Sequence, residues 1–359
     1  MRRFSTYGVA LATCGLILTA CGTAADNDSD SGSDAAPECD PVQIEGDAKV
    51  SLAYDVGGRG DQSFNDSAYA GLQKAATEFG LTDTSEGEAG QDESEDVREE
   101  RLRNFADTGH NVIVGVGFAY SEAVDTVAPD YPNVAFAVID GFDPTEDDVN
   151  CNVAYLGFAE NEGSYLVGAA AASQSETGTI GFVGGVNNTL IQKFEAGYTA
   201  GAEAVNPDIE VLTTYIEESD PAGFGDPAGG QAAAEGQYAD GADIVFHAAG
   251  FSGTGVFDAA VAADKLAIGV DSDQFLTAGP EQAQHIITSM LKRVDTATYG
   301  FIQSVVDGEP DQGFTTFTLA DDGVGYSTSG NFLTPETIAT LEDYKQQIID
   351  GDIEVPTAP

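Results

Sequence analysis

The strongest chemical pattern lies in residues 52–71, where an apolar run ends at Asp55 and a glycine-rich turn leads to Asp61-Gln62-Ser63-Phe64-Asn65. Open parallel sheets bind ligands at the ends of their strands, and the glycines allow a ligand to approach the backbone closely. Ser63 or Asn65 could also cap the helix that follows, and that role would explain their presence by itself. The pattern therefore predicts a ligand site, with helix capping as the simpler alternative.

The residues that usually perform catalysis are poorly arranged for it. The three histidines, at 110, 247 and 285, lack the spacing of metal ligands. Residues 250–254 approach a nucleophile elbow around Ser252, but the final glycine is displaced by one position. The phosphate-binding lysine motif and the third glycine of a dinucleotide fingerprint are both missing from the sequence. We therefore predict a binding protein without a cofactor or metal, and no enzyme.

The first twenty residues have the pattern of an export signal. Arg2 and Arg3 precede an apolar run over residues 9–18, which is too short to span a bilayer. Residues 18–22, Leu-Thr-Ala-Cys-Gly, resemble a bacterial lipobox, which implies that Cys21 is lipidated and becomes the N-terminus after cleavage. Two or more acyl chains would give stable anchoring on the extracytoplasmic face of the cell membrane. The alternative is an ordinary secretory peptide with a chance cysteine.

The remaining cysteines predict one disulfide. With residues 1–20 removed and Cys21 lipidated, Cys39 and Cys151 are the only pair left in an oxidising compartment. We predict a Cys39–Cys151 bond. A metal site is the alternative, but neither cysteine has a CxxC partner or a nearby histidine.

The rest of the chain alternates between strand and helix patterns. Residues 21–47 are polar and acidic and are expected to form a tether. Beyond them, continuous apolar runs alternate with helical patterns, which is typical of parallel sheets in an α/β fold. Strands are expected near 49–55, 111–116, 134–139, 179–183, 209–214, 242–246 and 266–270, and helices near 66–79, 95–108, 120–129, 161–174, 190–205, 229–239 and 254–263.

These units are too many for one compact sheet, so two Rossmann-like lobes are expected, divided near residue 157. After residue 270 the chain has too few elements for a third lobe and should cross back to complete both, which creates a hinge and a cleft between the lobes. The predicted first lobe comprises 48–157 and 284–310, and the predicted second lobe comprises 158–283 and 311–355.

The 52–71 segment resembles the basic membrane lipoprotein (PnrA-like) family, the purine-nucleoside receptors of ABC transporters. The resemblance covers nearly the whole chain after the tether, and its motifs are specific in their order and spacing rather than singly. The further matching segments are 115–118, 137–140, 181–185, 193–198, 248–250, 269–274 and 288–295. The resemblance implies a type I periplasmic-binding-protein fold whose lobes close on a nucleoside. The nucleoside is expected to be a purine nucleoside such as inosine, guanosine or adenosine.

The resemblance also implies roles for single residues. Phe64 and Phe251 would stack on the two faces of the base, and Asp55 and Asn65 would bond its edge. The ribose would meet the side chains of Asp140, Asp271 and Lys292 and the backbone of Gly253.

Each of these roles has a competing interpretation. Phe64 could belong to the core, Asp140 could cap a helix, and Lys292 could be a solvated partner of Asp295. Asp273 competes with Asp271 for the sugar.

The charge balance narrows the class of ligand. The 359 residues carry 61 acidic and 13 basic side chains, a formal charge of −48, which becomes −50 once the two N-terminal arginines are removed. Such a surface repels nucleic acid, and an acidic cleft favours an uncharged nucleoside over a nucleotide. We expect a monomer that delivers the nucleoside to an ABC permease. The first alternative is a sensor for a membrane regulator, and the second, less favoured by the sequence, is a nucleoside hydrolase.

Overall fold

The structure is a computed structural model that describes residues 42–44, 47–142 and 150–359. The predicted signal segment, with Cys21, and nearly all of the predicted tether, with Cys39, lie outside the described residues. The helices and strands of the described residues belong to one compact unit.

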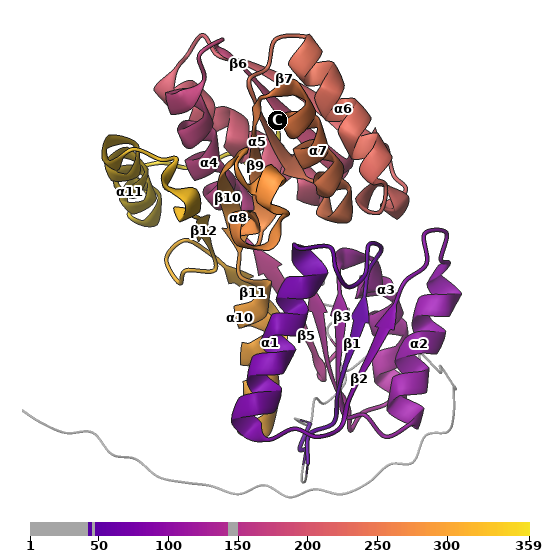
Figure 1. The fold of residues 1–359 in the computed structure, drawn as a ribbon. Coiled ribbons are helices and arrows are strands. Elements are labelled where there is room, and N and C mark those ends of the chain that lie inside the picture. Colours follow the sequence, from indigo (N-terminus) through magenta and orange to yellow (C-terminus); the bar gives the residue numbers. More distant parts are fainter. Residues whose placement is uncertain (1–41, 45–46, 143–149) are drawn as a thin grey trace, which may run out of the picture. The chain divides into compact units, whose positions relative to one another are not determined.

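The first lobe is built on a six-stranded parallel sheet with the order β11-β5-β4-β3-β1-β2. β1, β3, β4 and β5 are buried along their whole length, as expected for a sheet covered on both faces. Figure 1 shows α1 and α10 on one face of this sheet and α2 and α3 on the other. Its strands are β1 (Val50–Tyr54), β2 (Thr84–Glu88), β3 (Val112–Val116), β4 (Ala135–Ile139), β5 (Val153–Phe158) and β11 (Gly313–Phe317), and its helices are α1 (Phe64–Phe79), α2 (Glu95–Asp107), α3 (Ser121–Val127) and α10 (Val294–Val306), with 3-10 turns η1 (Phe118–Tyr120) and η2 (Ala128–Asp130).

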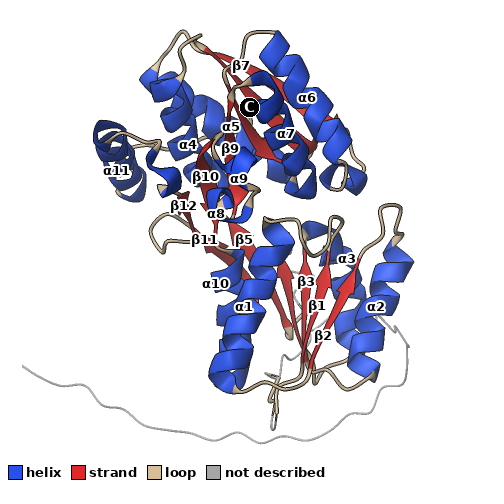
Figure 2. Ribbon diagram, in the orientation of Figure 1, coloured by secondary structure: helices blue, strands red, loops and turns tan. Residues whose placement is uncertain are grey.

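The second lobe repeats this plan with the strand order β12-β10-β9-β8-β6-β7, in which only β12 is antiparallel to its neighbour. Figure 2 shows its helices packed around the sheet. Its strands are β6 (Thr179–Val186), β7 (Glu210–Glu217), β8 (Ile244–Ala248), β9 (Leu266–Asp271), β10 (Ile286–Lys292) and β12 (Val324–Tyr326), and its helices are α4 (Glu160–Gln174), α5 (Thr189–Val205), α6 (Pro227–Ala239), α7 (Gly253–Ala263), α8 (Gln274–Thr277), α9 (Pro280–Ala283) and α11 (Pro335–Ile349), with 3-10 turns η3 (Pro221–Phe224), η4 (Gly250–Ser252) and η5 (Ser329–Asn331).

The predicted α/β fold with two lobes is confirmed, but the predicted lobe boundaries need correction. β10, expected in the first lobe, pairs with β9 in the second sheet, and β11, expected in the second lobe, pairs with β5 in the first. The chain therefore crosses between the sheets three times: after β5, after β10 and after β11. Hydrophobic pattern shows that a segment is a strand, but the choice of sheet depends on which open edge it meets.

The edge strand β2 was not expected from the sequence. Its residues, Thr-Ser-Glu-Gly-Glu, contain no apolar side chain, and exposure alternates along it. An edge strand exposed in this way has no buried face to mark it in the sequence.

Candidate functional site

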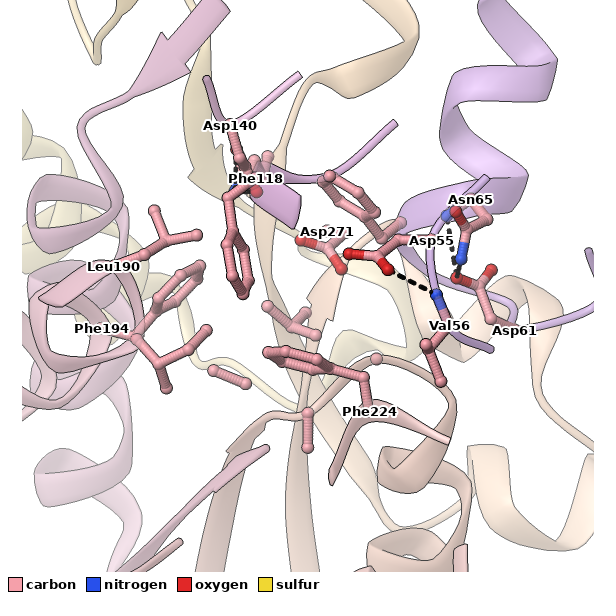
Figure 3. Close-up of a pocket in the computed structure, with 18 residues that line it drawn as sticks. Asp55, Val56, Asp61, Asn65, Phe118, Asp140, Leu190, Phe194, Phe224 and Asp271 are labelled. Carbon is pink, nitrogen blue, oxygen red and sulfur yellow. Dashed lines mark hydrogen bonds and ion pairs between the residues drawn. The ribbon is translucent and has the colours of Figure 1, made fainter. Parts of the chain in front are cut away.

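A cavity lies where the carboxyl ends of the strands in the two sheets face each other (Figure 3). It encloses about 560 Å³ of space, part of it open to solvent. Its lining residues are Asp55, Val56, Asp61, Phe64, Asn65, Gly117, Phe118, Asp140, Leu190, Ile191, Phe194, Phe224, Ala248, Ala249, Gly250, Val270, Asp271 and Lys292.

Asp55 follows directly after β1 and faces the cavity from the first lobe. Its Oδ1 accepts the backbone N–H of Val56 at 2.8 Å, and its side chain is almost wholly buried. Burial raises the pKa of Asp55 to about 6, partly offset by the Val56 N–H. The carboxylate therefore keeps Oδ2 as a hydrogen-bond acceptor for a ligand.

Asp61 and Asn65 form a second polar pair on the same side. Asp61 Oδ2 accepts the backbone N–H of Asn65 at 2.8 Å and its side-chain Nδ2 at 3.1 Å. Asp61 Oδ1 accepts the backbone N–H of Ser63 at 3.0 Å and of Asp66 at 3.1 Å. Asp61 thus satisfies N–H groups at the start of α1, so the capping role expected of Ser63 or Asn65 is carried by Asp61.

Lys292 lies at the end of β10, where the chain leaves the second sheet. Its Nζ is 2.6 and 2.7 Å from the two carboxylate oxygens of Asp140, in the first lobe, and 3.2 Å from Glu160 Oε1. The other oxygen of Glu160, Oε2, is 3.2 Å from Lys193 Nζ. Burial would lower the pKa of Lys292, but Asp140 and Glu160 hold it above its ordinary value. Lys292 is therefore a buried cation that joins the two lobes.

Asp140 and Asp271 occupy matching places in the two sheets. Asp140 follows β4 and Asp271 ends β9, and both have left-handed backbone conformations, with φ of 61° and 62°. Such conformations are uncommon for residues other than glycine and gather at functional sites. Ser63 Oγ, in the first lobe, donates to Asp271 Oδ2 at 2.5 Å, and burial raises the pKa of Asp271 to about 7.

Four phenylalanines supply most of the apolar wall. Phe64 begins α1, Phe118 begins η1, Phe194 lies in α5 and Phe224 ends η3. The rings of Phe118 and Phe224 meet edge to face across the lobes, with centroids 6.2 Å apart. Figure 3 shows the rings of Phe118, Phe194 and Phe224 around the same space that Asp55 and Asp271 face.

The structure brings six of the eight proposed ligand residues to this cavity: Asp55, Phe64, Asn65, Asp140, Asp271 and Lys292. Phe251 and Gly253 are not part of its lining. Phe251 packs near Gly57 instead, and a Cβ atom on Gly253 would lie 1.9 Å from the His247 ring, so this glycine makes room for a buried histidine. Phe224, from the second lobe, does line the cavity.

The structure also separates some competing interpretations. Lys292 is 2% exposed and contacts Asp140, whereas Asp295 pairs with Arg293. Asp273 is absent from the cavity lining and accepts from Ser329 Oγ. The geometry therefore favours a buried role for Lys292 and places Asp271, rather than Asp273, at the cavity.

Several residues that line the cavity were not predicted from the sequence, and neither was Glu160, which contacts Lys292. Phe118 and Phe194 lie inside segments that carry the family resemblance, so those motifs contained a sign of them. Asp61 lies in the Asp-x-Ser-Phe-Asn motif but was given no role. Phe224 follows an irregular Pro- and Gly-containing segment, and Glu160 starts a helix after the hinge. Neither of these two has a local sequence pattern that indicates a site.

The remaining candidates lie away from the cavity. His247 is buried, its Nε2 is 3.0 Å from Gln274 Oε1, and burial lowers its pKa to about 4. Among the described residues no group of three or more His, Cys, Asp or Glu side chains could hold a metal ion. Cys151 is disulfide-bonded, but its expected partner Cys39 lies outside the described part of the chain, so the pairing stays a prediction. No helix in the described ranges has the length and apolar character needed to cross a membrane.

Comparison with known proteins gives the same fold. A solute-binding protein of an ABC transporter system from Aeropyrum pernix K1 superimposes with a TM-score of 0.75 at 30% identity, over 86% of this chain and 93% of its own. The type I periplasmic-binding-protein fold is therefore confirmed.

Sequence relatives extend the comparison. A Listeria innocua protein described as a CD4+ T-cell-stimulating antigen is 36% identical over 99% of both chains. A Lactococcus lactis protein described as an ABC transporter nucleoside-binding protein is 32% identical over 88% of this chain and 91% of its own. Residues 48–358 match the family model of PnrA-like ABC transporter substrate-binding proteins. The chain therefore belongs to this family, whose members bind solutes for ABC transporters and are not enzymes.

Proposed function

We propose that this protein binds a purine nucleoside between its two lobes and delivers it to an ABC permease. The observation that carries the proposal is the composition of the cavity, in which phenylalanine rings lie beside strand-end carboxylates and a single lysine. The Lactococcus lactis relative described as nucleoside-binding supports the same class of ligand.

The aromatic wall suits the base. Stacking of a base on an aromatic ring contributes about 1–3 kcal/mol, whichever base it is. Phe64 from the first lobe and Phe194 or Phe224 from the second would cover the base from opposite lobes, because these rings come from opposite sides of the cavity. In this proposal Phe224 takes the stacking role that the resemblance gave to Phe251.

The charged groups suit a ribose better than a phosphate. The vicinal hydroxyls of ribose donate well to carboxylates such as Asp140 and Asp271, and Lys292 can donate to a hydroxyl oxygen. The lining contains four aspartates and one lysine, and that lysine is already paired with Asp140 and Glu160. A phosphate at this site would meet mainly like charge, so we propose a nucleoside rather than a nucleotide.

Closure of the lobes would report that the site is occupied. Direct hydrogen bonds join the lobes: Ser63 donates to Asp271, Ser272 Oγ donates to the Ser63 carbonyl at 3.0 Å, and Gln91 Nε2 donates to the Gly225 carbonyl at 3.0 Å. A ligand that contacts both lobes stabilises this closed arrangement over an open one. A permease can then distinguish the loaded receptor from the empty one.

The proposal includes a lipid anchor at Cys21, which would hold the receptor on the extracytoplasmic face of the membrane beside its permease. The lipobox-like segment at residues 18–22 supports it. Intact-mass measurement of protein extracted from membranes should show a diacylglyceryl addition that is absent from Cys21→Ala. An unmodified Cys21 in membrane extracts would contradict the anchor.

Two measurements test the ligand. Mass spectrometry of small molecules released from the denatured purified protein should detect a nucleoside. Calorimetric titration should show binding of inosine, guanosine or adenosine without turnover, and no binding of a hexose control. Tight binding of a sugar or an amino acid, with no binding of any nucleoside, would overturn the proposal.

A further inference from the structure

Asp61 determines which end of the Asn65 side-chain amide, the nitrogen or the oxygen, can face the cavity. Both residues are buried, with 1% and 3% of their surfaces exposed. Asp61 Oδ2 lies 3.1 Å from Asn65 Nδ2, and its remaining bonds go to backbone N–H groups at the start of α1. An ionised carboxylate can only accept hydrogen bonds, so the amide nitrogen of Asn65 must face Asp61. The amide oxygen must then point the other way.

The amide oxygen of Asn65 has no hydrogen-bond partner among the residues that the structure describes. It is a buried atom without a hydrogen bond, on a residue that lines the cavity. Buried polar groups are nearly always paired in folded proteins, so an unpaired acceptor on a cavity wall indicates a missing donor. A bound ligand is the natural source of that donor.

Asp55 supplies a second acceptor on the same side. Its Oδ1 is occupied by the Val56 N–H, and Oδ2 has no protein donor among the described hydrogen bonds. Figure 3 shows Asp55 and Asn65 on the same side of the cavity, with Asp61 next to Asn65. The part of the first lobe that would meet a base edge therefore presents two acceptors.

We propose that Asp61 is a specificity-determining residue, which fixes Asn65 as an acceptor and so selects bases with two adjacent N–H donors. The inference rests on the proposed nucleoside function and deepens it. Guanine carries such an edge, because its N1–H and its 2-amino group are adjacent. Hypoxanthine has the N1–H alone, and adenine has an amino group beside an unprotonated ring nitrogen, whose lone pair would face an acceptor. Guanosine is therefore the preferred ligand.

Calorimetric titration of the full-length protein with four ribosides measures the preference directly. Guanosine should bind more tightly than inosine, inosine more tightly than adenosine, and purine riboside, which has no donor on that edge, more weakly than all three. We expect roughly tenfold or more between guanosine and purine riboside, as for loss of hydrogen bonds to a charged acceptor. 1-Methylguanosine, which lacks the N1–H, should also bind at least about fivefold more weakly than guanosine.

The variant Asp61→Asn tests the role of Asp61 itself. A neutral amide at 61 can donate to Asn65 Oδ1, which allows the Asn65 side chain to turn and present its nitrogen to the cavity. The ratio of guanosine to purine riboside affinity should fall by roughly fivefold or more. Asp66→Asn is the matched control, because the Asp66 carboxylate accepts from Arg59, Gly60 and Gln62 and has no described hydrogen bond with Asn65. It should leave the ratio unchanged.

The outcomes separate the two levels of the proposal. If no nucleoside binds, the proposed function fails. If all four ribosides bind equally, or Asp61→Asn keeps the wild-type ratio, the specificity role of Asp61 is wrong while the nucleoside function stands. The ranking of ribosides and of 1-methylguanosine on the unaltered protein remains decisive even if Asp61→Asn does not fold.

Discussion

The two lobes share one strand plan but present different chemistry to the cavity. β4 and β9 hold the same place in their sheets, and each leads to an aspartate with φ near 60°. Beyond that shared position the lobes differ. The first contributes Asp55, Asp61 and Asn65, whereas the second contributes mainly apolar residues, which are Leu190, Ile191, Phe194, Phe224, Ala248, Ala249 and Val270.

The polar lining of the first lobe therefore lies in the segments that follow its strands rather than in the strands themselves. The first lobe would hold the polar edge and one flat face of a ligand, and the second would close over the other face. Asp271 and Lys292 are the exceptions, since both come from the second sheet. Lys292 pairs with Asp140 in the first lobe. The experiments below test this division, from the largest expected effect to the smallest.

Removing Lys292 should have the largest effect. Lys292→Ala leaves Asp140 and Glu160 as buried carboxylates without their shared cation, which should lower the free energy of unfolding by about 3–5 kcal/mol. Urea denaturation followed by circular dichroism measures it. Lys345→Ala is the control, because its partner Asp322 is 81% exposed in the side chain and such a pair contributes less than about 1 kcal/mol. An equal decrease in the free energy of unfolding in both variants would show that the buried ion pairs of Lys292 stabilise the fold no more than an exposed pair does.

Removing one aromatic ring from each lobe should weaken binding without changing selectivity. Phe64→Ala and Phe224→Ala should each raise the Kd for every nucleoside by roughly tenfold or more, since stacking contributes about 1–3 kcal/mol regardless of the base. Titration of guanosine and adenosine with each variant measures this. A change in base preference in either variant would contradict the assignment of recognition to the polar side.

Asp271 should link binding to closure. Asp271→Ala removes both a proposed ribose acceptor and the acceptor of the Ser63 bond between the lobes, so affinity should fall roughly tenfold. The melting temperature of the unliganded protein should change little. Ser63→Ala removes only the bond between the lobes and should cost less affinity than Asp271→Ala. The reverse order would show that Asp271 does not contact the ligand.

The buried carboxylates should make unliganded stability depend on pH. The pKa of Asp55 is raised to about 6 and that of Asp271 to about 7, from an ordinary value of 3.8. A raised folded-state pKa stabilises the fold below the unfolded value, near 4, and this contribution is lost as pH rises through about 6 to 7.

The free energy of unfolding should therefore fall by about 1–3 kcal/mol between pH 5 and pH 8, a range set by one to two pKa units of protonation difference. Denaturation at several pH values measures this dependence. Asp271→Asn should flatten it. An unchanged slope in that variant would mean that Asp271 does not titrate as its burial implies.

The smallest effect is expected at Phe251. Because Phe251 does not line the cavity, Phe251→Ala should change nucleoside affinity by less than about threefold. Substitutions of residues that do not contact the ligand usually change affinity by no more than this. Phe224→Ala, its matched comparison, should have the larger effect. The opposite result would restore Phe251 as the second stacking residue.

Much of this site was predictable from the sequence because its residues stand next to strand ends. Asp55, Asp140 and Asp271 each follow or end an apolar run, and parallel strands bring their carboxyl ends to one edge. The resemblance also assigned Phe251 and Gly253 to the ligand, but neither lines the cavity, since the turn after β8 places Phe251 near Gly57 and Gly253 against His247. Local pattern identifies the turn but not the direction of each side chain within it.

The sequence by itself determined the family, the two-lobed α/β fold and the polar turn after β1, because all three follow from local patterns and the order of motifs. Only the tertiary structure decided that β10 and β11 exchange sheets, that Glu160 lies beside Lys292 and that Phe224 closes the cavity. These features join distant parts of the chain, as Ser63 and Asp271 do across 208 positions. Such contacts depend on how the lobes dock, which hydrophobic period and local spacing do not encode.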